Sequence, residues 1–254
     1  MKDPVVILGM GEMGGVFARG FLRAGHPVYP VTRNMDLAQA AKDIPEPALV
    51  LVAVAENDLH PVLEKIPAPW AGRLVLLQNE LLPRDWEKYD LSPTVISVWF
   101  EKKKGMEAKV IIPSPVFGTH SGLVATALDA IEIPTQVLDT ADNLLFELVV
   151  KNLYILTSNI CGLKVGGTVG ELWKNHEHFA RAVISEILAL QEWMTGKSMD
   201  EEALIQTMLK AFDGDPDHKC MGRSAPARLE RALGLAKKAG IETPELKSIQ
   251  ASAH

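Results

Sequence analysis

Cysteine is scarce in this chain of 254 residues, which contains only Cys161 and Cys220. Two cysteines are too few for a disulfide scaffold, and they do not have the spacing of zinc ligands. His176-Glu177-His178 offers two close histidines without an evident third ligand, which is more typical of a solvated turn than of a metal site. We therefore expect a reducing, cytoplasmic location and no metal.

Long apolar runs and basic clusters are also missing. No uninterrupted apolar run approaches the roughly 18 residues of a transmembrane helix. The N-terminus enters its first expected strand within about four residues, which leaves no room for a signal peptide. The longest basic run is Lys102-Lys103-Lys104, and the formal net charge of −6 disfavours non-specific binding to nucleic acid. We therefore expect neither a membrane nor a nucleic acid as a partner.

Apolar runs and helical patterns alternate in the first half of the chain, up to about Thr140. Such alternation is typical of an α/β fold with a largely parallel sheet. We expect strands at 5–8, 27–31, 48–55, 73–77, 94–100, 108–112, 115–118 and 135–138. Helices are expected between Gly14 and Gly25 and at 35–42, 60–66 and 122–130.

The second half of the chain has a helical pattern almost to its end. We expect helices at 144–161, 169–195, 200–212 and 224–239, and a last one from Pro244. Asp142 or Asn143 is expected to cap the first of them, and Asp200 the third. The sequence therefore predicts a Rossmann-type nucleotide-binding domain at 1–141 and an all-helical domain at 142–254, with the substrate site in the cleft between them.

A glycine-rich turn follows the first strand. Gly9-Met10-Gly11-Glu12-Met13-Gly14 has the G-x-G-x-x-G pattern and directly precedes an amphipathic helix. In such turns the first glycine permits the tight turn, the second lets backbone approach a pyrophosphate, and the third lets the helix pack close to the strand. Chance glycines in an ordinary strand–turn–helix are the alternative, which the surrounding strands disfavour. We predict that these residues contact a dinucleotide.

The ends of the next strands predict which dinucleotide binds. An acidic residue after the second strand usually selects NAD, but this chain has Thr32-Arg33-Asn34. Arg33 favours the 2′-phosphate of NADP through charge-assisted hydrogen bonds, unless it is an ordinary solvated arginine. Val54 and Ala55 end the expected strand 48–55, and Asn79 follows the strand 73–77 at the same sheet edge, so we predict that all three also contact NADP.

Lys151 lies in an apolar helical stretch. A lysine in such a place is costly unless it is paired or reaches a cleft. Ser158 and Asn159 lie about two turns further along the same side. An ammonium beside an amide suits a carbonyl reductase, because it stabilises the oxyanion and supplies its proton. A lysine that extends from a core helix to the surface is the equally weighted alternative.

The chain resembles the ketopantoate reductase (2-dehydropantoate 2-reductase) family, within the superfamily that has 6-phosphogluconate dehydrogenase-like helical domains. The resemblance covers nearly the whole chain and is based on several stretches. These are the glycine motif with Arg33, Gln78-Asn79, Lys151 to Asn159 with Gly170-Glu171-Leu172, and Ala236 to Pro244.

The resemblance implies reduction of a 2-oxo acid, 2-dehydropantoate, by NADPH in pantothenate biosynthesis. It implies that Lys151 is the general acid, that Asn159 helps to hold the substrate, and that Asn79 lies near the nicotinamide and the substrate. It also assigns the 2′-phosphate to Arg33 and suggests a homodimer, as in many relatives.

The chain departs from the family pattern at several positions. Ile155 replaces an asparagine, Ala55 replaces a lysine near the cofactor, and Glu80 replaces a glycine. A substrate-binding glutamate of the family aligns with Ser224 or a neighbour. Two other hypotheses therefore stay open. One is an NADP-dependent reductase of a different carbonyl or imine, and the other is an NADP-binding protein that has lost catalysis.

Overall fold

The computed structural model describes residues 2–252, which form two compact units. The first unit extends to Glu147 and the second begins at Leu148. The division falls inside helix α6 (Ala141–Val165), whereas the sequence analysis placed it before Asp142. The start of α6 therefore belongs to the first unit and the rest of it to the second.

The first unit is built on a seven-stranded sheet with the order β2-β1-β3-β4-β5-β8-β9. All pairings from β2 to β5 are parallel, β8 is antiparallel to β5, and β9 is parallel to β8. The strands are β1 (Val5–Leu8), β2 (Val28–Val31), β3 (Leu49–Val52), β4 (Leu74–Leu76), β5 (Thr94–Ile96), β8 (Ser114–Phe117) and β9 (Thr135–Val137). The predicted α/β fold of this half is confirmed.

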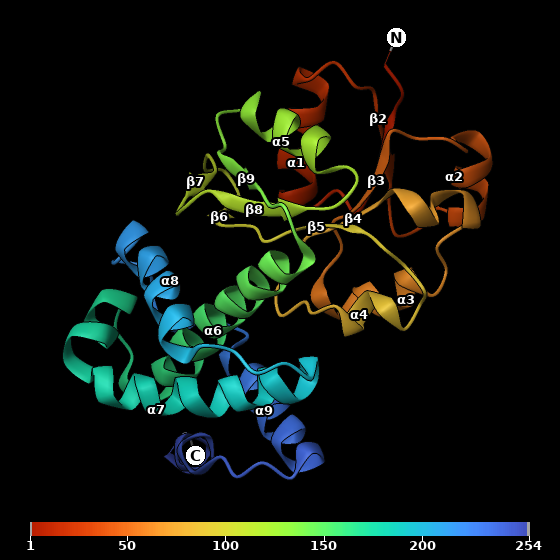
Figure 1. Cartoon of the computed structure of the whole chain (residues 1–254). Helices are drawn as coiled ribbons and strands as arrows, with labels where there is room; N and C mark the ends of the chain where they lie inside the picture. Colours follow the sequence, from red (N-terminus) through yellow and green to blue (C-terminus); the bar gives the residue numbers. More distant parts are fainter. Residues whose placement is uncertain (1, 253–254) are drawn as a thin grey trace. The chain divides into compact units, whose positions relative to one another are not determined.

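Helices flank this sheet, with α1 and α5 on one face and α3 and α4 on the other (Figure 1). They are α1 (Glu12–Arg23), α2 (Leu37–Asp43), α3 (Leu59–Leu63), α4 (Arg84–Glu87) and α5 (Ser121–Asp129), with 3-10 turns at Glu56–Asp58 and Ala68–Arg73. Phe17 and Phe21 of α1 are fully buried in the core beneath α1 and α5. A side chain at Gly20 would lie 2.5 Å from the carbonyl oxygen of Ala127, so α1 and α5 pack there backbone to backbone.

Three expected strands are wrong in extent, the first being 48–55, which is only β3 (Leu49–Val52) in the structure. The expected strand 94–100 is broken into β5 and β6 (Phe100–Glu101), and 108–112 shortens to β7 (Lys109–Val110), which pairs only with β6 in a small antiparallel sheet. The chain bends between β5 and β6, where the amide of Trp99 donates to the side-chain hydroxyl of Ser114 at 2.9 Å and not to a backbone carbonyl of a neighbouring strand. Trp99 is fully buried, so packing of its indole overrides the local strand pattern.

The second unit is helical, as predicted. It contains most of α6, followed by α7 (Val169–Thr195), α8 (Glu201–Gly214), α9 (Ala225–Ala239) and α10 (Pro244–Ser252). Asp200 caps α8 by accepting a hydrogen bond from the Ala203 amide at 3.1 Å, as expected. The expected cap of α6 was wrong, because the Thr140 hydroxyl accepts from the Asn143 amide at 3.1 Å and the helix starts at Ala141.

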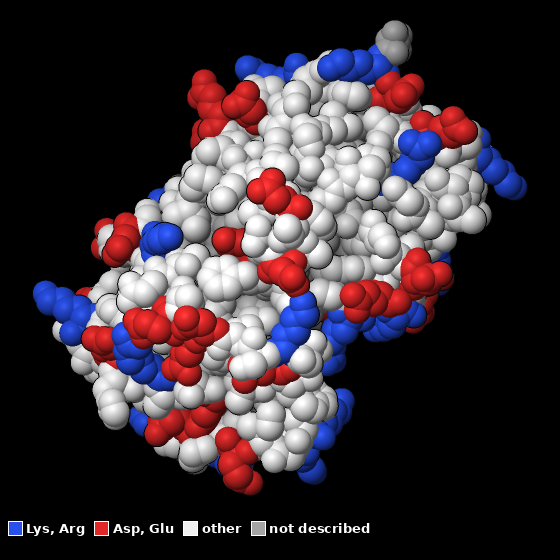
Figure 2. All heavy atoms as spheres, viewed as in Figure 1, with Lys and Arg blue, Asp and Glu red and all other residues white. Residues whose placement is uncertain are grey.

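Helix α6 is apolar enough to be compared with a membrane span. Among the described helices, it alone has the length and mean hydropathy to cross a membrane, but 78% of its most apolar window is buried within the structure. The core helix of a soluble protein has these same properties. Figure 2 shows acidic and basic side chains interspersed over the face in view, in keeping with the net charge of −6.

The last helix, α10, receives its cap from α7. Both oxygens of the Glu186 carboxylate accept backbone amides, from Glu245 at 2.7 Å and from Leu246 at 3.0 Å. Leu246 and Ile249 are fully buried. The cap satisfies amides that a helix start leaves without intrahelical partners, so it fixes α10 on α7.

Helix α7 begins with a capping box. The Thr168 hydroxyl accepts from the Glu171 amide at 3.3 Å, and Glu171 Oε2 accepts from the Thr168 amide at 2.9 Å. We expect Thr168→Ala to lower the free energy of unfolding by about 1 kcal/mol. Urea unfolding followed by circular dichroism measures this.

Thr207→Ala is the matched control, because the Thr207 hydroxyl bonds the Ala203 carbonyl inside α8 at 3.0 Å and caps nothing. A Thr168→Ala protein as stable as the Thr207→Ala protein would show that the capping box adds nothing to stability.

Candidate active site

Two glycines of the G-x-G-x-x-G turn are required by close backbone packing. Gly9 has a φ of +96°, and a Cβ on it would lie 2.7 Å from the carbonyl oxygen of Ala53, which follows β3. A Cβ on Gly14 would lie 2.1 Å from the carbonyl oxygen of Gly9. The turn therefore brings β1, the start of α1 and the end of β3 together at the carboxyl edge of the sheet.

The N-terminus of α1 is open to a ligand. Gly11 is the N-cap, has no side chain to cap the helix, and has no atom within 4 Å of where its Cβ would be. Met10 and Glu12 are exposed on either side of it. Free amides on an open helix start suit a pyrophosphate. Glu12 adds a negative charge here, and Lys102 partly offsets it at 3.4 Å.

A pocket of about 590 Å³ opens beside this turn. Two ion pairs lie on its wall, Glu12 with Lys102 and Arg19 with Glu107, the second at 3.0 Å. The lining is drawn from α1, the β6–β7 connection and the segment before β9: Met10, Gly11, Glu12, Gly15, Val16, Arg19, Lys102, Glu107, Ala108, Val110, Ile131, Glu132 and Ile133. The glycine turn is therefore accessible on this side.

Arg33 lies after β2 and makes an ion pair that the sequence did not reveal. Its guanidinium Nη2 lies 3.2 Å from Oδ2 of Asp58, which follows β3. Both side chains remain accessible, at 89% for Arg33 and 47% for Asp58. Thr32 and Asn34 are also exposed. A ligand phosphate at Arg33 therefore competes with the Asp58 carboxylate.

Gln78 and Asn79 follow β4 and have different surroundings. Gln78 is buried, and its amide Nε2 donates to the carbonyl oxygens of Val52 at 2.7 Å and Val54 at 3.3 Å. Asn79 is exposed, and its Nδ2 donates to Glu56 Oε1 at 3.0 Å. Gln78 thus ties the ends of β3 and β4 together, while Asn79 is oriented at the surface beside the exposed Ala55.

In the second unit, Lys151 lies on a largely buried stretch of α6. Its side chain is only partly accessible, and its Nζ lies 5.6 Å from the centre of the Tyr154 ring. Burial lowers the pKa of Lys151 to about 7, and the positive charge of Arg228 contributes to this shift. Lys151 is therefore able to donate a proton near neutral pH.

Arg228, on the first turn of α9, is the site residue that sequence reasoning missed. Its Nη1 donates to Asn159 Oδ1 at 2.8 Å, across 69 residues of sequence. Asn159 Nδ2 also lies 3.4 Å from the Ser158 hydroxyl. One signal was present in the sequence, because Arg228 falls beside the apolar stripe of α9 that contains Ala225, Leu229 and Ala232.

The segment between α8 and α9 is held against the start of α7. The Val169 amide donates to the His218 carbonyl at 2.9 Å, and the Gly170 amide donates to the Pro216 carbonyl at 3.0 Å. A Cβ on Gly170 would lie 3.1 Å from Pro216 Cβ, so glycine permits this approach. Gly170-Glu171-Leu172 is one of the stretches on which the family resemblance is based. Its glycine allows the start of α7 to pack against the segment between α8 and α9.

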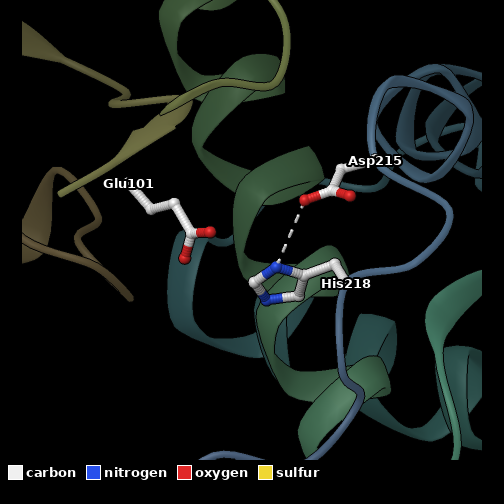
Figure 3. Close-up of side chains that lie close together, drawn as sticks. All are labelled: Glu101, Asp215 and His218. Atoms are coloured by element: carbon white, nitrogen blue, oxygen red, sulfur yellow. Dashed lines mark ion pairs between the residues drawn. The ribbon is translucent and has the colours of Figure 1, made fainter. Parts of the chain in front are cut away.

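This segment places a histidine near Tyr154 and an aspartate near that histidine. His218 Nδ1 lies 3.7 Å from Oδ2 of the buried Asp215, an ion pair when the imidazole is protonated (Figure 3). The His218 and Tyr154 rings have centroids 6.2 Å apart. Glu101, also labelled in Figure 3, belongs to the first unit and pairs there with Lys103 at 3.2 Å.

The predicted site residues thus form two groups. In the first unit, the glycine turn, Arg33, Val54, Ala55 and Asn79 all lie at the carboxyl edge of parallel strands. In the second unit, Lys151 and Asn159 both lie on α6. Arg228 donates a hydrogen bond to Asn159 and contributes to the lowered pKa of Lys151. Ile155, where the family has an asparagine, is buried in α6, and Ser224 is exposed before α9.

Comparison with known proteins links this fold to a group of reductases. No protein-family profile and no curated protein sequence matches the chain significantly. Among solved structures, a PanE/ApbA-family ketopantoate reductase from Ralstonia eutropha JMP134 is similar at 17% identity and a TM-score of 0.68, over 98% of this chain and 97% of that one. A 2-dehydropantoate 2-reductase from Methylococcus capsulatus has 15% identity and a TM-score of 0.69, over 98% and 94%.

A D-mandelate dehydrogenase, solved with NADH and anilino(oxo)acetate, is similar at 14% identity and a TM-score of 0.66, over 99% of this chain and 97% of that one. These identities are low, so the likeness concerns the fold. It extends over both units, which confirms the resemblance at that level. The chain has the fold of the ketopantoate reductases, a Rossmann-type sheet followed by a helical C-terminal region.

Proposed function

We propose that this protein is an NADPH-dependent reductase of a 2-oxo acid, with 2-dehydropantoate as the first candidate substrate. The observation that carries the proposal is Lys151, a lysine on a buried helix whose pKa is lowered to about 7. It occurs in a chain that has the fold of nicotinamide-dependent 2-oxo acid reductases. Perturbed lysines of this kind are typical of sites where a proton is transferred.

The residues at the sheet edge fit a dinucleotide. The open start of α1 at Gly11 is suited to its pyrophosphate, and Arg33 is suited to a 2′-phosphate. Gly9, Met10, Glu12, Met13 and Gly14 shape the turn, and Thr32, Asn34, Val54, Ala55 and Asn79 lie along the same edge. When bound, the cofactor supplies the hydride for reduction.

In this proposal the chain itself supplies the proton and holds the substrate. Lys151 Nζ polarises the ketone oxygen and protonates it as negative charge develops there. Asn159 and Asn79 position the substrate. A pKa near 7 lets Lys151 carry its proton at neutral pH and still release it to a strongly basic alkoxide.

The test is NADPH oxidation followed at 340 nm with 2-dehydropantoate and with a panel of other 2-oxo acids, aldehydes and imines. Turnover with 2-dehydropantoate supports the full proposal. Turnover only with other carbonyls or imines would move the assignment to a related reductase. Tight NADPH binding, followed by fluorescence, with no turnover of any compound would contradict the enzymatic proposal and support a protein that only binds the cofactor.

Cofactor preference depends on the Arg33–Asp58 pair. We expect Arg33→Gln to weaken NADPH binding about 10-fold or more, because a charge-assisted bond to phosphate is lost. Asp58→Asn should strengthen it by up to about fivefold, because an exposed ion pair is worth at most about 1 kcal/mol. Neither change should alter NADH binding much. Fluorescence titration of both cofactors measures these effects.

Arg23→Gln is the matched control, because Arg23 is an exposed arginine in the last turn of α1, away from the carboxyl edge of the sheet. Equal losses of NADPH affinity in Arg23→Gln and Arg33→Gln would mean that Arg33 does not recognise the 2′-phosphate. The assignment of NADP would then lose its main support.

The remaining expectations concern assembly and location. One structure of this fold is a ketopantoate reductase from Staphylococcus aureus described as dimeric. A homodimer and a cytoplasmic location stay predictions for this chain. Light scattering on the purified protein tests the first of them.

A further inference from the structure

Arg228 places a second cation in the part of the second unit that contains Lys151. Ala225, Leu229 and Ala232 form the buried stripe of α9, and Arg228 lies beside them in the first turn. The side chain is only partly accessible, and its guanidinium meets the amide of Asn159 on α6. Arg228 therefore directs its charged end to α6, the helix of Lys151, whereas an arginine on a solvated face extends its charged end into water.

The Asn159 contact orients the guanidinium of Arg228. Asn159 Oδ1 is an uncharged acceptor, and the bond of 2.8 Å uses one of the five N–H donors of arginine. The charge of Arg228 is felt at Lys151, where it disfavours a second positive charge. A guanidinium whose charge acts on Lys151 in this way also attracts an anionic group of a ligand bound beside that lysine.

The two cations differ in the groups that they recognise. A guanidinium is planar and binds a carboxylate through two parallel hydrogen bonds, whereas an ammonium is a compact point charge and proton donor. A 2-oxo acid carries a carboxylate bonded directly to its ketone carbon. Its two functional groups therefore match the two side chains, the carboxylate with arginine and the ketone oxygen with lysine.

We propose that Arg228 binds the carboxylate of the 2-oxo acid substrate and so selects 2-oxo acids over neutral carbonyl compounds. This inference rests on the proposed reductase function and adds the residue that defines its substrate class. Asn159 is then a positioning residue as well as a substrate contact, since its amide oxygen holds the guanidinium of Arg228.

The main test compares Arg228→Gln and Arg228→Lys with the wild-type protein, using the best 2-oxo acid of the panel and its methyl ester. We expect Arg228→Gln to lower kcat/KM for the acid about 10- to 150-fold, mainly through KM, because a charge-assisted hydrogen bond is lost. The ester should be affected less than about threefold, because it presents no carboxylate charge. Arg228→Lys should recover part of the loss for the acid.

Arg231→Gln is the matched control, because it removes the same charge from an exposed position one turn further along α9. Thermal unfolding of each variant separates folding from recognition. If Arg228 only ties α9 to α6, Arg228→Gln will affect acid and ester equally and lower the melting temperature. That result overturns the proposal.

A binding measurement keeps this proposal separate from the proposed reaction. Calorimetry with oxamate, a carboxylate analogue that is not reduced, is performed on the NADPH-saturated proteins. Binding to wild type and Arg231→Gln, but at least about 10-fold weaker binding to Arg228→Gln, supports the carboxylate site even if no compound turns over. Undiminished oxamate binding by Arg228→Gln, or none by wild type, contradicts the carboxylate site even where turnover is observed.

Discussion

Replacement of Lys151 by methionine should lower kcat about 10²- to 10⁴-fold, the range of a lost general acid. Methionine keeps an unbranched side chain in the same place on α6 but has neither the proton nor the charge. Because Lys151 belongs to the second unit and the dinucleotide motif to the first, NADPH affinity should change little. Steady-state kinetics at 340 nm and a fluorescence titration with NADPH measure the two quantities.

The pH dependence of kcat and kcat/KM tests the role of Lys151 independently of the substitution. The ammonium form is the proton donor, so kcat/KM for reduction should be highest below pH about 7 and fall about 10-fold per unit above it. A bound carboxylate should raise the pKa, so kcat should decline at a higher pH than kcat/KM. In Lys151→Met this basic limb should disappear.

The same pKa shift predicts how Lys151 affects stability. Its pKa is lowered from 10.5 to about 7 in the folded protein, so the unfolded chain binds more protons between these values. The contribution of this residue to the free energy of unfolding therefore rises as the pH rises through that window, and it is most unfavourable below about 7.

Lys164→Met is the control for the kinetics. Lys164 is an exposed lysine on the same helix, where its Nζ lies 4.9 Å from the centre of the Phe179 ring. Its replacement should leave kcat within about twofold of wild type, as for a surface substitution away from the site. Turnover by Lys151→Met at the rate of Lys164→Met would exclude Lys151 as the proton donor.

Gly14→Ala should lower the free energy of unfolding by about 3 kcal/mol or more and prevent tight NADPH binding. Its methyl group would lie 2.1 Å from the carbonyl oxygen of Gly9, and this neighbour is backbone, which moves only if the turn moves. Overpacking of a well-packed site typically costs about 1–3 kcal/mol, and this contact is closer than most. Denaturant unfolding and NADPH titration test both effects.

Gly15→Ala is a control in the neighbouring position of the same helix. No atom lies within 4 Å of a Cβ there, and the position is exposed. Because alanine favours helix over glycine, this variant should be more stable by about 0.5–1 kcal/mol. If both variants lose stability equally, the contact with Gly9 is not the cause.

The sequence predicted best those parts of the fold whose signals are local. An apolar run followed by glycines and an amphipathic helix defines β1, the turn and α1, because each element is specified by neighbouring residues. The same holds for the capping of α8 by Asp200. The prediction from sequence failed between β5 and β6, where the chain bends at the buried Trp99, whose amide donates to Ser114.

The candidate site was predicted only as far as single positions allow. Lys151 stood out because a charge is unusual in an apolar helical stretch, and Arg33 because a basic residue follows the second strand where an acidic one is usual. The partners of Arg33 and Asn159 did not stand out, because Asp58 is 25 residues from Arg33 and Arg228 is 69 residues from Asn159. Such pairings are set by how strands and helices pack, which no local pattern contains.

The cap that α7 provides to α10 has an evolutionary consequence. Glu186 accepts two amides at the start of a helix that is distant in sequence, so the N-terminal cap of the terminal helix for those two amides comes from another helix. We therefore expect a substitution at position 186 to be accompanied by a change at the start of the Pro244–Ser252 helix. A relative without the acid at position 186 needs a local cap for the first amides of this helix. In a relative without the helix, the carboxylate loses both of its hydrogen-bond donors.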